Sequence, residues 1–237
     1  MTQINLSSYE INIKKYSKKG RLNKGGFGIV CKVEEEETGK IYAAKIIDCG
    51  DDESQCNKLI EREIGVMICA KHPTIVKFIG FSKIDFHNEH NLTIIMELAA
   101  NGSLADLIKS NQQACGPVDY TNTTRQIIIT GVARGMKYLH DLNIIHRDLK
   151  SANILLDENF YPHISDFGFS KFFEVGHSYS QSAFCGTLYY EAPEILMNKP
   201  YDTKVDVYAF GILMFEVLTD SVPYPDLINH KLPDHIF

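Results

Sequence analysis

The first part of the chain has the pattern of short strands with one helix among them. Apolar and polar residues alternate from about residue 16 to 47, which is typical of strands. Residues 54–71 instead place apolar side chains three and four positions apart, which predicts a helix with one buried face. Two more strands are predicted at about residues 75–84 and 92–98. This part of the pattern therefore predicts a small sheet that carries one helix.

The pattern changes after Ala99, where longer helical segments replace the strands. Residues 103–111 and 121–141 each begin with a serine or threonine that can cap a helix. Residues 203–219 are apolar on nearly every face, so this helix belongs in the interior of a domain. We therefore predict an α+β protein with a small β-rich lobe, a short hinge and a larger helical lobe. A ligand-binding cleft is expected between the lobes.

Length and charge narrow the classes of protein. With 237 residues, of which 44% are hydrophobic, the chain can bury the core of one large domain or two small lobes. Its formal net charge of −6 provides no cationic field for a phosphate backbone, so we expect no nucleic-acid partner. The first residues do not form a basic and apolar leader, and no apolar run approaches the ~18 residues that span a bilayer. We therefore expect a soluble, cytoplasmic protein without direct membrane insertion.

The residue types that bind zinc do not form a recognisable site. His87 and His90 have a suitable side chain, but a solvated turn between two strands is the simpler interpretation of residues 85–91. The cysteines contain no Cys-x-x-Cys pair, which argues against structural zinc and against a disulfide framework. We expect six reduced thiols, at Cys31, Cys49, Cys56, Cys69, Cys115 and Cys185.

Two motifs carry most of the chemical information. The first reads His146-Arg147-Asp148-Leu149-Lys150-Ser151-Ala152-Asn153, and the second is Asp166-Phe167-Gly168. Together they put a base and two metal ligands at the spacing that phosphoryl transfer requires, because that reaction needs a positioned hydroxyl and cations that neutralise developing charge. With these motifs the chain resembles a protein kinase.

The resemblance assigns roles to four polar residues of the motifs. Asp148 would orient the acceptor hydroxyl, and Lys150 would contact the transferred phosphate. Asn153 and Asp166 would hold the metal, which we expect to be Mg²⁺, with Mn²⁺ as a substitute. Asp148 should stay ionised beside the metal and cationic neighbours, because opposite charges favour the carboxylate.

A glycine-rich segment near the start resembles the kinase loop whose backbone amides approach the phosphates of ATP. Asn23 occupies the first glycine position of that loop. Asparagine tolerates a left-handed backbone better than most residues, so we expect the turn to survive with an altered geometry or nucleotide affinity. The residues expected to bind the nucleotide here are Leu22, Lys24, Gly25, Gly26, Phe27, Gly28 and Val30.

The resemblance also implies a buried ion pair behind the phosphates. Lys45 lies on the third expected strand, and Glu63 lies on the helix that follows. Lys45 would bind the α- and β-phosphates and pair with Glu63. Glu61 is two residues earlier, which on a helix points it away from the face that Glu63 uses.

The adenine pocket is expected around the hinge. Met96 matches the position that guards the pocket, and the backbone of Glu97 and Ala99 would hydrogen-bond adenine. An apolar lining would come from Val30, Ala43 and Leu155.

These features predict an ATP-dependent serine/threonine kinase that acts on protein substrates in intracellular signalling. Lys150 is the residue type that serine/threonine kinases carry at this position, and Gly186-Thr187 points the same way. Residues 146–157 and 206–211 look most like the tyrosine-kinase-like group, which mostly phosphorylates serine and threonine. Two alternatives stay open: a pseudokinase that serves as an ATP-binding scaffold, and a tyrosine or dual-specificity kinase.

Support and control of the site are implied as well. In the family the counterpart of His146 packs under that of Phe167, and the counterpart of Asp206 braces the loop backbone. A phosphate near Arg147 would gain bidentate hydrogen bonds and order its segment. We therefore expect activation by an upstream kinase at one or more of Ser178, Tyr179, Ser180 and Ser182.

The resemblance also divides the chain. In the family several helices follow the position where this chain ends, and an arginine among them pairs with the glutamate that matches Glu194. We therefore expect a C-terminally truncated domain of reduced stability. The expected division is an N-terminal flank at 1–15 and a kinase domain at 16–237, with an N-lobe at about 16–96, a hinge at about 97–100 and a C-lobe at about 101–237.

Overall fold

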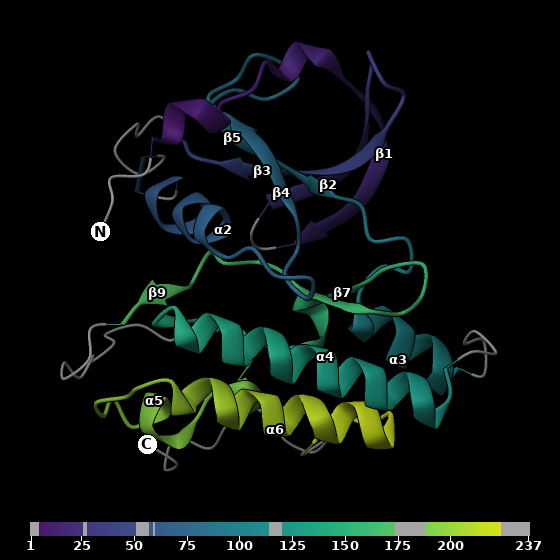
Figure 1. Ribbon diagram of the computed structural model, residues 1–237, viewed down its shortest axis with the longest axis vertical. Helices are drawn as coiled ribbons and strands as arrows, with labels where there is room; N and C mark the ends of the chain where they lie inside the picture. Colours follow the sequence, from purple (N-terminus) through teal and green to yellow (C-terminus); the bar gives the residue numbers. More distant parts are fainter. Residues whose placement is uncertain are drawn as a thin grey trace. The chain divides into compact units, whose positions relative to one another are not determined.

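The contacts of the computed structural model divide the chain into two units (Figure 1). The first unit comprises residues 1–71 and 76–99, and the second comprises residues 72–75 and 100–237. The structure describes residues 5–25, 28–50, 57–58, 60–113, 120–173 and 188–223, without the side chains of Lys24, Gly25 and Glu61.

A five-stranded antiparallel sheet forms the first unit, with strand order β1-β2-β3-β5-β4. The alternating pattern of the sequence is visible in β2, where Cys31 and Val33 are buried and Lys32 is exposed. The central strand β3 is buried on both faces over residues 42–45. The strands are β1 (Tyr16–Gly25), β2 (Gly28–Glu35), β3 (Ile41–Asp48), β4 (Phe78–Ser82) and β5 (Asn91–Glu97).

Residues 5–15, which the sequence places in a flank, pack against this sheet. Ile13 is 3% exposed and belongs to a core cluster that Cys31, Val33 and Ile95 share. The Ile11 N–H donates to the Phe81 carbonyl oxygen on β4, at 2.8 Å. The segment thus joins the outer strand β4 to the start of the other outer strand, β1.

The predicted helix after β3 is present but irregular. The described part contains a π-helical turn at Ile60–Ile64 that continues into α2 (Gly65–Cys69). The buried residues of α2 include Val66 and Met67, as the spacing of apolar residues predicts.

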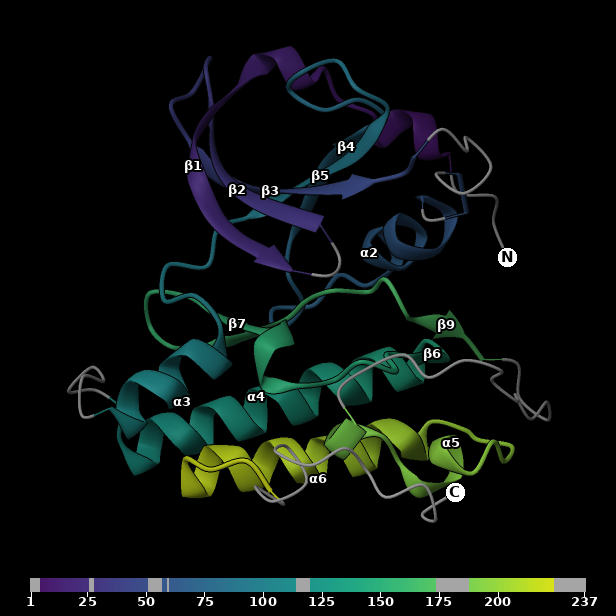
Figure 2. The same ribbon diagram turned by 180° about the vertical axis from the view of Figure 1, so that it is seen from behind.

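The second unit contains the long helices. α3 (Leu104–Gln112) and α4 (Asn122–Asp141) begin at the predicted caps Ser103 and Thr121, each of which forms a capping box. α6 (Lys204–Thr219) lies beside α4 in both views (Figures 1 and 2). The shorter elements are β6 (Ile144–Ile145), β7 (Ile154–Leu156), β8 (Pro162–Ile164), β9 (Lys171–Phe172) and α5 (Pro193–Leu196). None of the helices described is both long and apolar enough to cross a bilayer.

A cluster of polar contacts joins the ends of α3, α4 and α6. Asp220 follows α6 in a left-handed conformation, with φ 52°. Its carboxylate accepts hydrogen bonds from Asn111 Nδ2 at 2.7 Å, from Arg125 Nη1 at 3.0 Å and from Arg125 Nη2 at 2.5 Å. The guanidinium group of Arg125 also lies 4.2 Å from the ring centroid of Tyr120.

Candidate active site

The structure brings three of the predicted site residues together in the second unit. Asp148 is 5% exposed, and Lys150 Nζ donates to its two carboxylate oxygens at 2.9 and 2.8 Å. Asn153 Nδ2 donates to Asp148 Oδ2 at 2.8 Å and to the Asp148 carbonyl oxygen at 2.7 Å. These two donors hold the carboxylate of Asp148 in place.

The two expected metal ligands, Asn153 and Asp166, have side-chain oxygen atoms that fit a divalent cation. Asn153 uses its side-chain nitrogen on Asp148, so its amide oxygen is the atom left for a metal. Carboxylate and amide oxygens are hard ligands of the kind that Mg²⁺ binds, usually together with substrate phosphates. Asp166 supplies such a carboxylate, and it holds a left-handed backbone with φ 65°, a conformation that clusters at functional sites. The described residues contain no group of three or more side chains that could bind a metal by themselves.

A second aspartate, Asp206, holds the start of the first motif, residues 146–153, which we call the catalytic loop. Asp206, on α6, is 1% exposed and accepts hydrogen bonds from the backbone N–H groups of His146 and Arg147, both at 2.9 Å. His140 Nε2, on α4, lies 2.9 Å from the same carboxylate. The expected bracing by Asp206 is therefore present, and His140 adds to it.

His146 supports the second motif, as expected. Its ring is fully buried, with its centroid 5.3 Å from that of Phe167, and its Nε2 lies 3.1 Å from the Ser165 carbonyl oxygen. Ser165 in turn donates through its N–H and its hydroxyl to the Asn153 carbonyl oxygen, both at 2.9 Å. These contacts tie the segment before Asp166 to Asn153.

Arg147 is engaged within the described residues. Its Nε donates to the Phe169 carbonyl oxygen at 2.7 Å, and its Nη1 donates to the Tyr201 hydroxyl at 2.8 Å. The expected phosphorylation sites Ser178, Tyr179, Ser180 and Ser182 lie outside the described residues, as does Gly186-Thr187.

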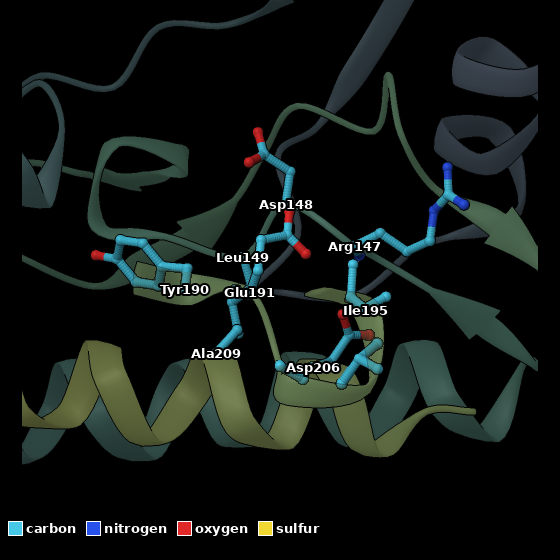
Figure 3. Close-up of a pocket in the computed structure, with 10 residues that line it drawn as sticks. Arg147, Asp148, Leu149, Tyr190, Glu191, Ile195, Asp206 and Ala209 are labelled. Carbon is cyan, nitrogen blue, oxygen red and sulfur yellow. Dashed lines mark hydrogen bonds between the residues drawn. The ribbon is translucent and has the colours of Figure 1, made fainter. Parts of the chain in front are cut away.

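Glu191 and Asp148 line one pocket (Figure 3). Burial raises the pKa of the Glu191 carboxyl to about 7, and the negative charge of Asp148 acts in the same direction. A carboxyl with such a pKa exchanges its proton near neutrality, and perturbed groups of this kind cluster at functional sites. The pattern of the sequence does not identify Glu191, because only its three-dimensional surroundings set it apart.

Another buried carboxylate lies at the far end of α6. Glu216 is 3% exposed and accepts a hydrogen bond from the Tyr190 hydroxyl. The Tyr190 oxygen also accepts from the Ser151 N–H at 3.0 Å. Burial raises the pKa of Glu216. Tyr190 thus connects the catalytic loop to α6, a link that no motif of the sequence predicts.

The expected ion pair is present in the first unit. Lys45 Nζ lies 2.7 Å from Glu63 Oε1, and the two residues are 7% and 2% exposed. Lys45 is positioned by β3, where it lies opposite Val30 of β2 and Ile94 of β5. Removal of one partner from a buried pair of this kind is strongly destabilising, because it leaves an uncompensated buried charge.

The glycine-rich segment differs from the expectation at Asn23. Asn23 lies in β1 opposite Val30 and does not take the left-handed backbone that the sequence argument assumed for it. Asn23 therefore belongs to a strand in this structure and not to a turn. Gly28 does have a positive φ of 119°, and a Cβ atom on it would lie 2.1 Å from the Ile46 carbonyl oxygen. Leu22 is 50% exposed, and Gly26 and Phe27 lie outside the described residues.

The residues expected around adenine lie in both units. In the first unit Met96 is buried on β5 and lies opposite Ala43 on β3. The Glu97 N–H donates to the Lys77 carbonyl oxygen at 3.0 Å, so it is used inside this unit. Val30 is half-buried and Ala99 follows β5. Leu155 is half-buried on β7 in the second unit.

Comparisons with known proteins show the family of the chain. The family model described as "Protein kinase domain" matches residues 16–236. A probable serine/threonine-protein kinase of Dictyostelium discoideum is 37% identical over 86% of this chain and 19% of its own length. An Aurora kinase of Yarrowia lipolytica is 34% identical over 86% of this chain and 52% of its own length. The dual specificity protein kinase shkB of Dictyostelium discoideum is 33% identical over 90% of this chain and 32% of its own length. The chain therefore spans between about a fifth and about half of these relatives.

Proposed function

The chain belongs to the protein kinase domain family, and from this we propose that it transfers the γ-phosphate of ATP to serine or threonine hydroxyls of protein substrates. The observation that carries the proposal is the buried Asp148 carboxylate, which Lys150 and Asn153 hold from two sides. Three relatives whose names contain "serine/threonine-protein kinase", two from Dictyostelium discoideum and one from Trypanosoma brucei brucei, support this acceptor class.

The geometry around Asp148 suits orientation of a hydroxyl. The carboxylate accepts a hydrogen bond from the acceptor hydroxyl and so directs its oxygen toward the phosphorus atom. Lys150 lies next to the Asp148 carboxylate, close to the hydroxyl that it orients, and balances the negative charge that accumulates during transfer. Because both carboxylate oxygens are already held, Asp148 has one orientation in which to receive the substrate.

A protein kinase domain uses ATP together with a divalent metal, and we propose Mg²⁺ as that metal, with Mn²⁺ as a substitute. Asn153 and Asp166 hold it through oxygen atoms. The metal, when bound, offsets the charge of the phosphates. Lys45, which pairs with Glu63, binds the α- and β-phosphates. Glu97 contributes to adenine binding through its carbonyl oxygen, since its N–H is used by Lys77.

Control by an upstream kinase acting within residues 178–182 is part of the proposal. Arg147 precedes the catalytic aspartate in the chain, and guanidinium groups bind phosphate through two parallel hydrogen bonds. We also propose a cytoplasmic location, where ATP and protein substrates are both available.

The test is transfer of labelled γ-phosphate from ATP to a generic protein substrate with and without Mg²⁺. The modified residue is identified by mass spectrometry. Asp148→Asn should abolish transfer, because the amide accepts the hydroxyl hydrogen bond more weakly and disrupts the contact with Lys150. Asp141→Asn is the matched control, since Asp141 lies in an exposed pair with Lys137 and should leave transfer unchanged.

Each other outcome selects a different function. Transfer to tyrosine would favour a dual-specificity kinase, the name that one relative carries. A folded chain that binds ATP and transfers nothing would favour a pseudokinase scaffold.

A further inference from the structure

The sheet of the first unit has one covered edge and one open edge. At the β4 edge residues 5–15 run beside the strand, where Glu10 forms a parallel bridge with Phe81 and the Ile11 N–H donates to the Phe81 carbonyl oxygen. At the other edge β1 is the outermost strand in both views, and β2 is its only partner among the strands described (Figures 1 and 2). An edge strand presents backbone N–H and C=O groups that can pair with a further strand.

Two exposed cations lie on one face of the sheet at the open edge. Lys18 of β1 is opposite Val33 of β2, and Arg21 of β1 is opposite Cys31. Residues that are directly opposite each other in an antiparallel pair share a face. Both cations therefore belong to the face that carries the core cluster of Cys31 and Val33, and both are exposed at its margin.

A third exposed cation lies on the other face. Lys32 stands between Cys31 and Val33 on β2, so its side chain points to the opposite side of the sheet, and its partner on β1 is Gly20. A Cβ atom on Gly20 would meet nothing within 4 Å, so no side chain separates Lys32 from the open edge. Over the ranges that the structure describes, none of these three cations forms an ion pair or a side-chain hydrogen bond.

The surroundings of this edge have a surplus of positive charge. Residues 14–40 contain eight lysines and arginines and four glutamates, a formal net charge of +4 in a chain whose net charge is −6. Two of the glutamates are already paired, Glu37 with Lys15 and Glu34 with Lys19. Cations on an edge strand discourage pairing with a like-charged strand, including the same edge of a second copy. The same charges attract an acidic strand.

We propose that the open edge of β1 binds an extended, acidic segment of a protein partner, which adds to the sheet as a further strand. Backbone hydrogen bonds provide the pairing, and acidic side chains provide the selectivity. Because successive side chains of a strand point to opposite faces, one acidic strand meets Lys18 and Arg21 on one face and Lys32 on the other. An anionic lipid surface contacts one face and leaves the backbone groups of the edge unpaired, so the geometry favours a peptide. The inference is independent of the proposed function.

The first test compares labelled peptides that differ only in charge. Each has the ten residues of β1 in length, with pairs of glutamates alternating with pairs of valines, so that both faces carry acids. The neutral counterpart has glutamine in place of glutamate. Fluorescence anisotropy at two salt concentrations should give a Kd about tenfold or more lower for the glutamate peptide, with a difference that shrinks as salt screens the charges. Equal Kd values for the two peptides would overturn the proposal.

Variants decide whether the three cations cause the preference. A chain with Lys18→Gln, Arg21→Gln and Lys32→Gln should bind the glutamate and glutamine peptides alike. The control chain loses the same charges at three exposed positions of the second unit, through Lys109→Gln, Arg134→Gln and Lys199→Gln. It should keep the wild-type preference, and an equal loss in both chains would overturn the assignment to this edge. All six positions are exposed, so the melting temperatures of the two chains should agree, which verifies that both fold.

Methylation of the peptide backbone separates strand addition from simple attraction between charges. The N–H groups of a strand face its two edges alternately. The glutamate peptide methylated at every second nitrogen keeps one complete edge and should bind like its parent. The peptide methylated at every nitrogen has the same charge and should bind about tenfold more weakly or worse, because neither edge can donate. Equal binding of all three peptides would overturn strand addition. Vesicles of phosphatidylserine and phosphatidylcholine that bind the wild type, while no peptide does, would overturn the proposal in favour of a lipid surface.

Discussion

The side-chain nitrogen of Asn153 donates to the Asp148 carboxylate at 2.8 Å, and this contact determines which atom of Asn153 can face a metal. Asn153→Ala removes both the restraint on Asp148 and the amide oxygen. We expect transfer to fall about 10- to 100-fold, the usual effect of losing a supporting contact at a metal site. The Mg²⁺ concentration for half-maximal activity should rise. A Mg²⁺ titration at fixed ATP measures both effects, with the exposed Asn159→Ala as control. Activity within twofold of wild type would contradict the assignment.

Asp206 should be a large single contributor to stability in the second unit. Asp206→Asn replaces one acceptor oxygen with a donor that faces N–H groups of the catalytic loop. We expect the free energy of unfolding to fall by about 2–3 kcal/mol, since hydrogen bonds to charged groups contribute this much. His140→Ala removes only one of the three donors and should cost less. Urea unfolding followed by circular dichroism compares them, and equal losses would show that the backbone contacts contribute little.

The contact between Arg125 and Asp220 should be strongly coupled. Asp220→Asn keeps a residue that tolerates the left-handed backbone but loses the charge. A double-mutant cycle with Arg125→Met should give a coupling free energy of about 1–3 kcal/mol, as expected for contacting residues in one network. The exposed pair Lys137 and Asp141 is the control and should give at most about 0.5 kcal/mol. Similar values for the two pairs would be inconsistent with this account.

Glu191 should lower stability at neutral and alkaline pH. Burial raises its pKa to about 7, above the ordinary value of a glutamate, so between these two values the folded chain binds a proton that the unfolded chain has released. Stability therefore decreases as pH rises through this range. Glu191→Gln lacks this titrating group. Its melting temperature minus that of the wild type should therefore increase from pH 5 to pH 8. Glu216 is unchanged in both chains, so its titration cancels in the difference. A difference that is constant with pH would rule out the raised pKa.

Gly80 should be required because residues 5–15 pass close to it. A Cβ atom at Gly80 would lie 2.4 Å from Ile11 Cγ2 and 2.9 Å from the Tyr9 carbonyl oxygen. Gly80→Ala should therefore lower the free energy of unfolding by about 1–3 kcal/mol, a typical effect of overpacking. Ile11→Ala should relieve part of that loss when combined with it. Gly20→Ala, where a Cβ atom meets nothing within 4 Å, is the control. Thermal unfolding of the four chains provides the comparison.

Local patterns predicted the elements better than their pairing. The alternation around Cys31 and Val33, and the caps Ser103 and Thr121, depend on neighbours in sequence, so they could be recognised directly. The order of the sheet could not, because β5 pairs between β3 and β4 through contacts distant in sequence. The packing of Ile13 in the core also depends on contacts distant in sequence, so the local pattern could not predict it either.

The motifs likewise named residues that the structure brings together, and the resemblance named two of their supports, His146 and Asp206, but not the others. Asp148, Lys150 and Asn153 lie within one short loop, so their proximity follows from the chain itself. His140, Tyr190 and Glu216 reach the loop from other elements, and their sequence surroundings resemble those of ordinary helix or loop residues. At Asn23 the resemblance to the glycine-rich loop predicted a turn, whereas the structure places this residue in strand β1.

The two buried carboxylates of α6, Asp206 and Glu216, restrict which changes in sequence the helix tolerates. Asp206 holds the start of the catalytic loop, and Glu216 holds Tyr190, which contacts Ser151 near the end of that loop. The two are ten positions apart, or about 15 Å along a helix. An insertion or deletion between them would turn one carboxylate by about 100° and shift it by about 1.5 Å. Apolar residues of α6 can therefore be exchanged for others of similar volume, whereas the number of residues between the two acids is fixed.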